Sequence, residues 1–282
     1  MTIGANPVPL DPLTNAPETH YLFIDGGYLR DLYGQCIKNV FDVDPVIDYA
    51  RIKIEYRARK AFYYDSLHDL PKQGESPQQT RERVSAQRAE LDRIQALDGF
   101  HVRLGSMSGT VRKARQKQVD VLLAVDMLTH GFLKNMSVVT LISGDLDFLP
   151  VVETLTRSGT YVRVVHERRS GSRELRHAAD VGTVITVETL LLWLRYDVRN
   201  RCKPPDRIFP GTVPGPPEQI FKRGMLKGKP VDFYKNGGAY VLFAREYEGP
   251  QALRLQHEDP KLIERYVSAT DGAIEWEPEE KP

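Results

Sequence analysis

The chain has 282 residues, of which 41% are hydrophobic, and its 39 Lys and Arg residues almost balance 38 Asp and Glu residues. This length suits one full-sized domain with a smaller second one. The net charge of +1 indicates no class of partner, so only local clusters of charge can do so. No run of about eighteen apolar residues predicts a transmembrane helix, and the first residues lack the pattern of a secretory signal. We therefore expect a soluble cytoplasmic protein that does not contact a membrane.

The two cysteines, Cys36 and Cys202, lie far apart and belong to no Cys/His ligand pattern. This spacing excludes a disulfide framework and a structural zinc site. We expect two reduced and buried thiols.

Short apolar segments alternate with helix-like segments from residue 20 to residue 197. The expected strands are 21–25, 60–66, 100–105, 137–145, 160–165 and 182–186, and the expected helices are 26–33, 76–97, 118–132, 147–159, 172–180 and 187–197. The helix 118–132 is expected to be buried, because apolar residues cover most of its circumference, and the basic segment before it reads as a loop. This alternation predicts an α/β fold, a mostly parallel sheet with helices on both faces, whose strands all end at one edge.

The composition divides the chain into four regions. They are a flexible N-terminal segment (1–19), the α/β domain (20–197), a linker rich in Pro and Gly (198–217) and a small β-rich module (218–282). In the module, the pattern around Asn236-Gly237 is typical of a hairpin, since these residues tolerate positive φ. Because the linker separates regions of different composition, a chain ending near Asp197 is expected to fold by itself.

Four acidic residues fall where this architecture brings strand ends together. Asp25 ends the first strand, Asp145 and Asp147 end the fourth, and Asp120 opens the helix after the basic loop. Taken singly, Asp120 and Asp145 could be helix N-caps or first-turn acids. Taken together, four carboxylates within about 5 Å would repel by a few kcal/mol per pair at an effective dielectric near 20, and a cation would offset this repulsion.

Ligation by carboxylate oxygens alone favours a hard ion, Mg²⁺ or Mn²⁺. Such an ion polarises a phosphoryl oxygen, lowers the pKa of an attacking water and offsets charge on the leaving oxygen. The four acids therefore predict a metal-dependent hydrolase of phosphodiester bonds.

Several segments of the chain also match a known family in order. They are YLFIDGGYL, AFYYDS, KQVDVLLAVDML, LISGDLDFLPVVETLTRSGTYVRVV and HAADVGTVIT. These segments resemble the NYN domain, a branch of the PIN-like nucleases, over roughly residues 20 to 195. The resemblance implies a PIN-like sheet and metal-dependent cleavage of RNA, with single-stranded RNA as the expected substrate. It also implies metal ligands at the matching positions Asp25, Asp120, Asp145 and Asp147.

One position departs from the family pattern. Members usually carry Asn three residues after the first Asp, and this chain has Tyr28. A non-catalytic RNA-binding or regulatory module is therefore an alternative reading. A toprim-like enzyme is a second alternative, although it needs Glu in place of Asp25 and leaves Asp120 without a role. A phosphatase of the haloacid dehalogenase type needs an acid where Gly27 stands.

Basic residues are expected to surround the acidic edge and to bind RNA phosphates. Those before Asp120 are Arg112, Lys113, Arg115 and Lys117, and those after the fifth strand are Arg168, Arg169, Arg173 and Arg176. The alternative for both groups is a solvated, charged surface.

Other polar and aromatic side chains near the strand ends have two readings each. The rings of Tyr28, Tyr63 and Tyr64 could stack on bases or belong to the core. His166 and His177 could act as general acids or be merely hydrogen-bonded. A homodimer formed through the C-terminal hairpin or a helix face is compatible with the sequence.

Overall fold

The computed structural model describes residues 18–67, 69–105, 112–168, 173–207, 219–248 and 251–278. Contacts divide the chain into two compact units. Unit 1 runs to Asp31 and resumes over Asp48–Ile185, whereas unit 2 comprises Leu32–Ile47 and the chain from Thr186 onward. The expected boundary at 197 thus differs from this division, in which the helices after residue 186 group with the C-terminal sheet.

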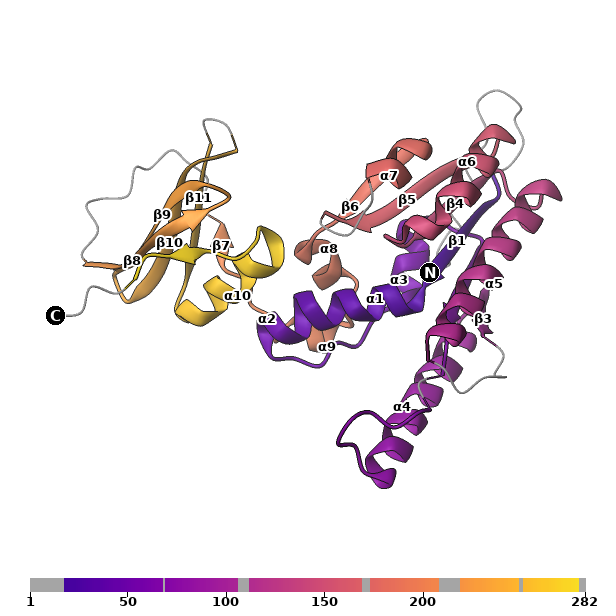
Figure 1. The fold of residues 1–282 in the computed structure, drawn as a ribbon, viewed down its shortest axis with the longest axis horizontal. Helices are drawn as coiled ribbons and strands as arrows, with labels where there is room; N and C mark the ends of the chain where they lie inside the picture. The colour runs from indigo at the N-terminus through magenta and orange to yellow at the C-terminus, as the bar shows by residue number, and fades with distance from the viewer. Residues whose placement is uncertain are drawn as a thin grey trace, which may run out of the picture. The chain divides into compact units, whose positions relative to one another are not determined.

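Unit 1 contains one parallel sheet of six strands (Figure 1). The strands are β1 (His20–Asp25), β2 (Lys60–Asp65), β3 (Phe100–Leu104), β4 (Val138–Ile142), β5 (Tyr161–Glu167) and β6 (Val181–Ile185). Their order is β3-β2-β1-β4-β5-β6, and every neighbouring pair is parallel. The strand order reverses between β1 and β4, and such a switch point is where open α/β sheets bind ligands.

Helices cover both faces of this sheet, as expected. They are α1 (Gly26–Tyr33), α3 (Tyr49–Glu55), α4 (Pro77–Gln95), α5 (Arg112–Phe132), α6 (Leu149–Arg157) and α7 (Arg173–Ala178). On one face, Phe23 packs in a core that includes Met127 of α5, Val152 of α6 and Leu175 of α7. On the other face, Tyr63 contacts the ring of Tyr49 in α3 with the centroids 5.3 Å apart. The expected α/β fold is therefore confirmed.

Local sequence signals account for where two of these helices begin. Ser76 and Gln79 form a capping box at the start of α4, and Pro77 occupies its first position. Gly26 starts α1 directly after β1, where a Cβ would overlap the ring of Tyr63 and the carbonyl oxygen of Tyr64. The close approach of α1 to β2 thus requires glycine at this position.

Helix α5 differs from its prediction in two ways. Its first residue is Arg112, so the basic segment expected to be a loop is the first part of the helix. The helix is also amphipathic: Leu123 and Met127 are buried, but Val121 and Val125 are 62% and 52% exposed. The apolar residues of this segment therefore do not all belong to the core.

Unit 2 is built around an antiparallel sheet. Its strands are β7 (Asp206–Arg207), β8 (Gln219–Leu226), β9 (Lys229–Asn236), β10 (Ala239–Glu248), β11 (Gln251–His257) and β12 (Glu275–Trp276), in the order β12-β8-β9-β10-β11-β7. The β9–β10 hairpin is present, but its two-residue turn is Gly237-Gly238, because Asn236 already pairs with Ala239. Both glycines have positive φ, at 56° and 88°.

Helices and a short early segment of the chain complete unit 2. These elements are the π-helical turn η1 (Gly34–Lys38), α2 (Asn39–Phe41), α8 (Val187–Leu192), α9 (Tyr196–Arg199) and α10 (Pro260–Thr270). Helix α10 contacts η1 and α2, and the hydroxyl of Tyr266 donates a 2.6 Å hydrogen bond to Glu188. The C-terminal helix is thus packed against chain that the sequence assigned to the first domain.

Part of the predicted linker is a β-strand. Its residues Asp206 and Arg207 form β7 and pair with β11, while 208–217 lie outside the described residues, as do 1–17 of the expected N-terminal segment. Cys36 and Cys202 are both buried thiols that form no disulfide, as expected. No helix in the described part of the chain is long and apolar enough to cross a membrane.

Candidate functional site

The site centres on Asp25, where the two middle strands of the parallel sheet end. Its Oδ2 accepts a 3.0 Å hydrogen bond from the hydroxyl of Ser143, which follows β4. Its Oδ1 accepts a 3.0 Å hydrogen bond from the backbone N–H of Tyr28 in α1. These two bonds fix the carboxylate at the β1/β4 switch point.

Burial raises the pKa of Asp25, because removal from water penalises the charged form. The hydrogen bonds from Tyr28 and Ser143 oppose this effect, whereas the neighbouring carboxylates of Asp145 and Asp65 add to it. The charged form of Asp25 is therefore disfavoured mainly because the carboxyl is buried, and to a smaller extent because two carboxylates lie near it.

Asp145 and Asp147 lie in the turn that follows β4. The side chain of Asp145 accepts a 2.9 Å hydrogen bond from the backbone N–H of Asp147 and caps the 3₁₀ turn η2 (Leu146–Phe148). Its own N–H donates to the hydroxyl of Ser143 at 3.2 Å. Ser143 thus connects Asp145 to Asp25. The prediction that Asp145 is a helix N-cap is confirmed. The side chain of Asp147 is exposed.

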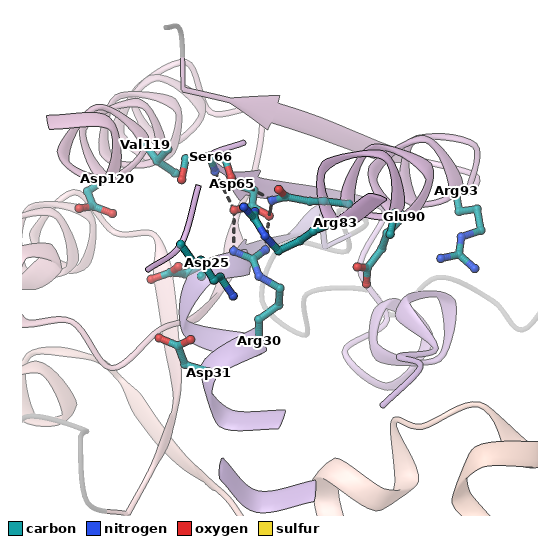
Figure 2. Close-up of a pocket in the computed structure, with 14 residues that line it drawn as sticks. Asp25, Arg30, Asp31, Asp65, Ser66, Arg83, Glu90, Arg93, Val119 and Asp120 are labelled. Carbon is teal, nitrogen blue, oxygen red and sulfur yellow. Dashed lines mark hydrogen bonds and ion pairs between the residues drawn. The ribbon is translucent and has the colours of Figure 1, made fainter. Parts of the chain in front are cut away.

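Asp120 is well inside α5 rather than at its start, so the N-cap reading is wrong for this residue. It lines a pocket of about 600 Å³ together with Asp25 and Asp65, and Figure 2 shows these acids around it. The other residues that line the pocket are Gly27, Arg30, Asp31, Ser66, Lys72, Arg83, Ala86, Gln87, Glu90, Arg93 and Val119. The structure therefore brings Asp120 and Asp25 to one cavity.

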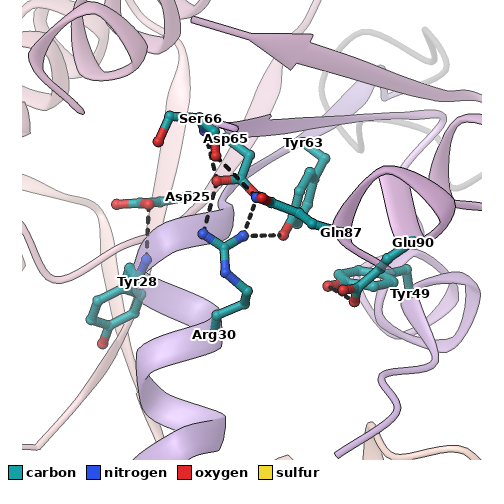
Figure 3. Close-up of polar contacts among 9 residues, drawn as sticks. All are labelled: Asp25, Tyr28, Arg30, Tyr49, Tyr63, Asp65, Ser66, Gln87 and Glu90. Atoms are coloured by element: carbon teal, nitrogen blue, oxygen red, sulfur yellow. Dashed lines mark hydrogen bonds and ion pairs between the residues drawn. The ribbon is translucent and has the colours of Figure 1, made fainter. Parts of the chain in front are cut away.

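Asp65 is an acid of this site that the sequence analysis missed. It ends β2, is 3% exposed, and forms an ion pair with Arg30 of α1, whose Nη2 donates to Oδ1 at 2.8 Å. The same guanidinium donates to the hydroxyl of Tyr63 at 3.2 Å (Figure 3). The available signal was the segment YYDS, since an acid that ends the strand beside β1 must lie close to Asp25.

Tyr28 stands where the family pattern has Asn, and its side chain points away from the Asp25 carboxylate (Figure 3). The hydroxyl accepts a 2.6 Å hydrogen bond from the backbone N–H of Glu167, which ends β5. Tyr28 therefore joins α1 to β5 through its side chain and supports Asp25 through its backbone N–H.

The predicted basic groups are described only in part. The side chains of Arg112, Lys113, Arg115 and Lys117, and all of Arg169, lie outside the described residues, while Arg168, Arg173 and Arg176 are exposed. The pocket instead has cations that the sequence analysis did not select, among them Lys72 and Arg93, which are exposed. Arg83 also lines it and pairs with Glu75 at 2.7 Å.

The surroundings of two tyrosines and two histidines bear on the alternatives predicted for them. Tyr63 and Tyr64 are 1% and 0% exposed, so both belong to the core and the stacking role is wrong for them. His166 is buried, with Nδ1 2.8 Å from the carbonyl oxygen of Glu167, and His177 accepts a hydrogen bond from Arg173 at 3.3 Å. These hydrogen bonds agree with the simpler reading, and a general-acid role of either histidine stays a prediction.

The donor chemistry of the site fits a hard divalent cation. Asp25, Asp120 and Asp145 offer carboxylate oxygens, and the charges of Asp145 and Asp65 act on the buried Asp25 carboxyl in addition to its burial. Asp65 fits this role less well, because its charge is already paired with Arg30. Within the described ranges, no three His, Cys, Asp or Glu side chains are grouped as ligands of one ion.

The carboxylates of this α/β protein lie at the switch point of its parallel sheet, which is where open α/β sheets bind ligands. The family model of the NYN domain matches residues 20–188, and the chain belongs to this family of PIN-like nucleases. A crystal structure of VPA0982, described as a protein of unknown function from Vibrio parahaemolyticus RIMD 2210633, is 21% identical. The match covers 63% of this chain and 96% of that one, with a TM-score of 0.44. No curated protein matches the chain.

Proposed function

We propose that the protein is a metal-dependent ribonuclease that hydrolyses phosphodiester bonds of single-stranded RNA at the pocket beside Asp25. The observation that carries this proposal is the Asp25 carboxylate, which Ser143 and the Tyr28 backbone hold at the β1/β4 switch point beside Asp145. Membership of a PIN-like nuclease family supports a hydrolase. The metal and the RNA substrate are the further steps that we propose.

Asp25, Asp120, Asp145 and Asp147 are the proposed ligands of Mg²⁺ or Mn²⁺. When bound, such an ion supplies Lewis acidity to the phosphoryl oxygen and lowers the pKa of the attacking water. The protein contributes orientation: the hydroxyl of Ser143 and the N–H of Tyr28 each occupy one oxygen of Asp25 and leave other lone pairs for a ligand.

Cations around the pocket are suited to bind the RNA backbone. Lys72 and Arg93 are exposed, so their charges can meet phosphates without the cost of removal from water. Arg30 has a different role, because it neutralises the buried Asp65 and keeps the wall of the pocket in place. The predicted group Arg112, Lys113 and Arg115 would extend the basic surface along α5.

A cleavage assay tests the proposal. The full chain is incubated with labelled single-stranded RNA, the matched DNA and duplex RNA, with Mn²⁺, with Mg²⁺ or with a chelator. We expect metal-dependent cleavage of single-stranded RNA, with DNA largely spared. Asp25→Asn should reduce the rate by orders of magnitude, because it removes a charge at almost constant volume. Cleavage that persists in both Asp25→Asn and chelator would come from a contaminant and contradict the proposed site.

Tyr28 favours a second candidate, an RNA-binding module that has lost activity. The side chain that replaces the usual Asn points away from the Asp25 carboxylate, and its hydroxyl accepts a hydrogen bond from the N–H of Glu167. This candidate predicts that RNA is bound but stays intact with either metal. Tyr28→Asn should then introduce activity, whereas Tyr28→Phe, which lacks the hydroxyl and offers no amide, should not.

A further inference from the structure

The antiparallel sheet of unit 2 has a group of aromatic and lysine side chains on one face, here called the aromatic face. It consists of Phe221 and Lys222 of β8, Lys235 of β9, Tyr240 of β10 and Trp276 of β12. Phe221 is 54% exposed, Lys235 is exposed, and Tyr240 and Trp276 are half-buried. The rings rest on Phe233, which is fully buried beneath them.

A β-bulge explains how adjacent residues share this face. Consecutive side chains of a strand normally point to opposite faces, but the register of β8 against β9 shifts between Ile220 and Lys222. As a result, the ring of Phe221 contacts Phe233 and Tyr240, with centroids 6.0 and 5.8 Å apart. The bulge therefore adds a large apolar ring to a face where it stays mostly in water.

The lysines of the aromatic face lie over its rings. The Nζ atom of Lys222 is 5.3 Å from the ring centroid of Trp276 and 5.9 Å from that of Phe221. The Nζ atom of Lys235 is 5.9 Å from the centroid of Tyr240. The Nζ atom of Lys222 lies 3.2 Å from Oε1 of Glu264 in α10, so α10 borders this face. The carboxylate of Glu264 offsets part of the positive charge of Lys222.

We propose that the aromatic face binds single-stranded RNA, with bases stacked on the rings of Phe221 and Tyr240 and phosphates bound by Lys222 and Lys235. Exposed rings interleaved with cations match the two parts of an unpaired strand, because every base has a flat apolar surface and every linkage carries a negative charge. A protein partner would suit the rings, but two lysines placed over them favour a polyanion. This binding does not depend on cleavage at Asp25.

The first test measures binding of a fluorescent oligouridylate by anisotropy. All variants are full-length and also carry Asp25→Asn, and a chelator is present, so that the probe stays intact. Phe221→Leu keeps an apolar contact with Phe233 but removes the flat ring, and it should weaken binding by roughly fivefold or more. Lys235→Gln should also weaken binding and lower the slope of log affinity against log salt by about 0.7.

Matched controls separate this face from the rest of unit 2. Ile220→Ala changes the neighbouring residue of β8, which pairs with Tyr234 outside the bulge and is 39% exposed. Lys261→Gln removes an exposed lysine of α10. Both controls should leave affinity and salt slope unchanged. The proposal would be overturned if all four variants bound the probe with equal affinity, or if all four lost the same amount of affinity. It would also be overturned if the protein bound other proteins through this face but did not bind the RNA probe.

Tryptophan fluorescence gives an independent readout. The chain has two tryptophans, of which Trp193 is fully buried in unit 2 and Trp276 borders the aromatic face. Addition of unlabelled oligouridylate should quench the emission of the Asp25→Asn protein, and Trp276→Phe should abolish the quenching. Quenching that persists in Trp276→Phe, or none in the parent protein, would contradict an RNA strand on this face. A failure of the cleavage assay alone would leave both binding results unaffected.

Discussion

The hydroxyl of Ser143 donates a 3.0 Å hydrogen bond to Asp25 and so joins the ends of the two central strands, which lie 118 residues apart in the sequence. This bond forms where the strand order reverses, between β1 and β4. It holds a carboxylate whose pKa is raised mainly by burial.

The first prediction concerns the stability of Asp25→Asn in the absence of metal. A raised pKa in the folded state means that folding favours the protonated carboxyl of Asp25. Its contribution to the free energy of unfolding is complete below the ordinary pKa of 3.8 and is lost as the pH rises through the raised pKa. At pH 7 the charged carboxylate therefore opposes folding. Asp25→Asn should shift the urea midpoint upward at pH 7 in chelator, and the shift should shrink as the pH falls toward 3.8. A midpoint lowered at every pH would contradict this account of the charge.

The second prediction concerns the ion pair of Arg30 and Asp65. Arg30→Met should destabilise the fold by about 3 kcal/mol, because it leaves the charge of Asp65 buried without its partner. Asp65→Asn should cost less, since Arg30 is 27% exposed and can reach water. In a double-mutant cycle measured by urea unfolding, the double variant should lose less free energy of unfolding than the two single variants lose together. Strict additivity would mean that the pair contributes no coupling.

The third prediction concerns pH and His20 of β1. Burial, with a further contribution from Arg163, lowers the pKa of His20 to about 4, and its Nε2 lies 2.8 Å from the hydroxyl oxygen of Thr140 in β4. Because the pKa is lowered, folding favours the neutral imidazole of His20. Its contribution to the free energy of unfolding is complete above pH 6.5 and is lost as the pH falls to about 4, a loss of about 3 kcal/mol at most. His20→Gln should flatten the pH dependence of the urea midpoint over this interval. An unchanged dependence would show that other groups cause it.

The sequence was sufficient to predict the parallel sheet, since each strand is an apolar run that ends at an acid, a glycine or a polar turn. It also placed Asp25 and Asp145 near each other, because strand ends share one edge. Asp65 was missed because the strand order was not known, and only the pairing of β1 with β2 brings it beside Asp25. The start of α5 was predicted too late in the chain, because helices are recognised by regularly spaced apolar residues and the basic segment before residue 118 has none at that spacing.

Other features could not be predicted because they depend on contacts between distant segments. The Pro and Gly composition after residue 200 suggested a linker, but tertiary pairing makes Asp206 and Arg207 a strand of the second sheet. Similarly, nothing in the sequence around Val40 and Phe41 shows that α2 packs against a helix more than 200 residues later.

The fourth prediction revises the expectation that a chain ending near Asp197 folds by itself. Such a chain lacks α10, which contacts η1 and α2, where the apolar residues Ile37, Val40 and Phe41 are buried in the full chain. Exposure of this surface should lower the thermal midpoint and promote aggregation. As a milder control, Tyr266→Phe removes only the hydrogen bond to Glu188 and should cost about 1 kcal/mol. A truncated chain that is monomeric and as stable as the full one would contradict the grouping of these segments in unit 2.

The last prediction compares the two groups of cations proposed to bind RNA in unit 1. Lys72 and Arg93 line the pocket beside Asp25, whereas Arg112, Lys113 and Arg115 begin α5. If both groups contact phosphates, neutralising either should weaken the binding of every RNA sequence alike, since phosphate contacts do not read bases. Each lost contact should lower the slope of log affinity against log salt by about 0.7 for a single strand.

The two groups should differ in their effect on cleavage. Lys72→Gln with Arg93→Gln removes charges at the pocket itself, so the rate at saturating RNA should fall together with affinity. Neutralising Arg112, Lys113 and Arg115 should weaken affinity but leave the saturated rate close to that of the parent protein, because those residues would position RNA farther along the helix. Arg57→Gln, on an exposed arginine of unit 1 that does not line the pocket, is the matched control and should change neither quantity. A salt slope unchanged in both sets of variants would show that RNA approaches Asp25 from another side, and the search for its path would then move to Arg168 and Arg173 after β5.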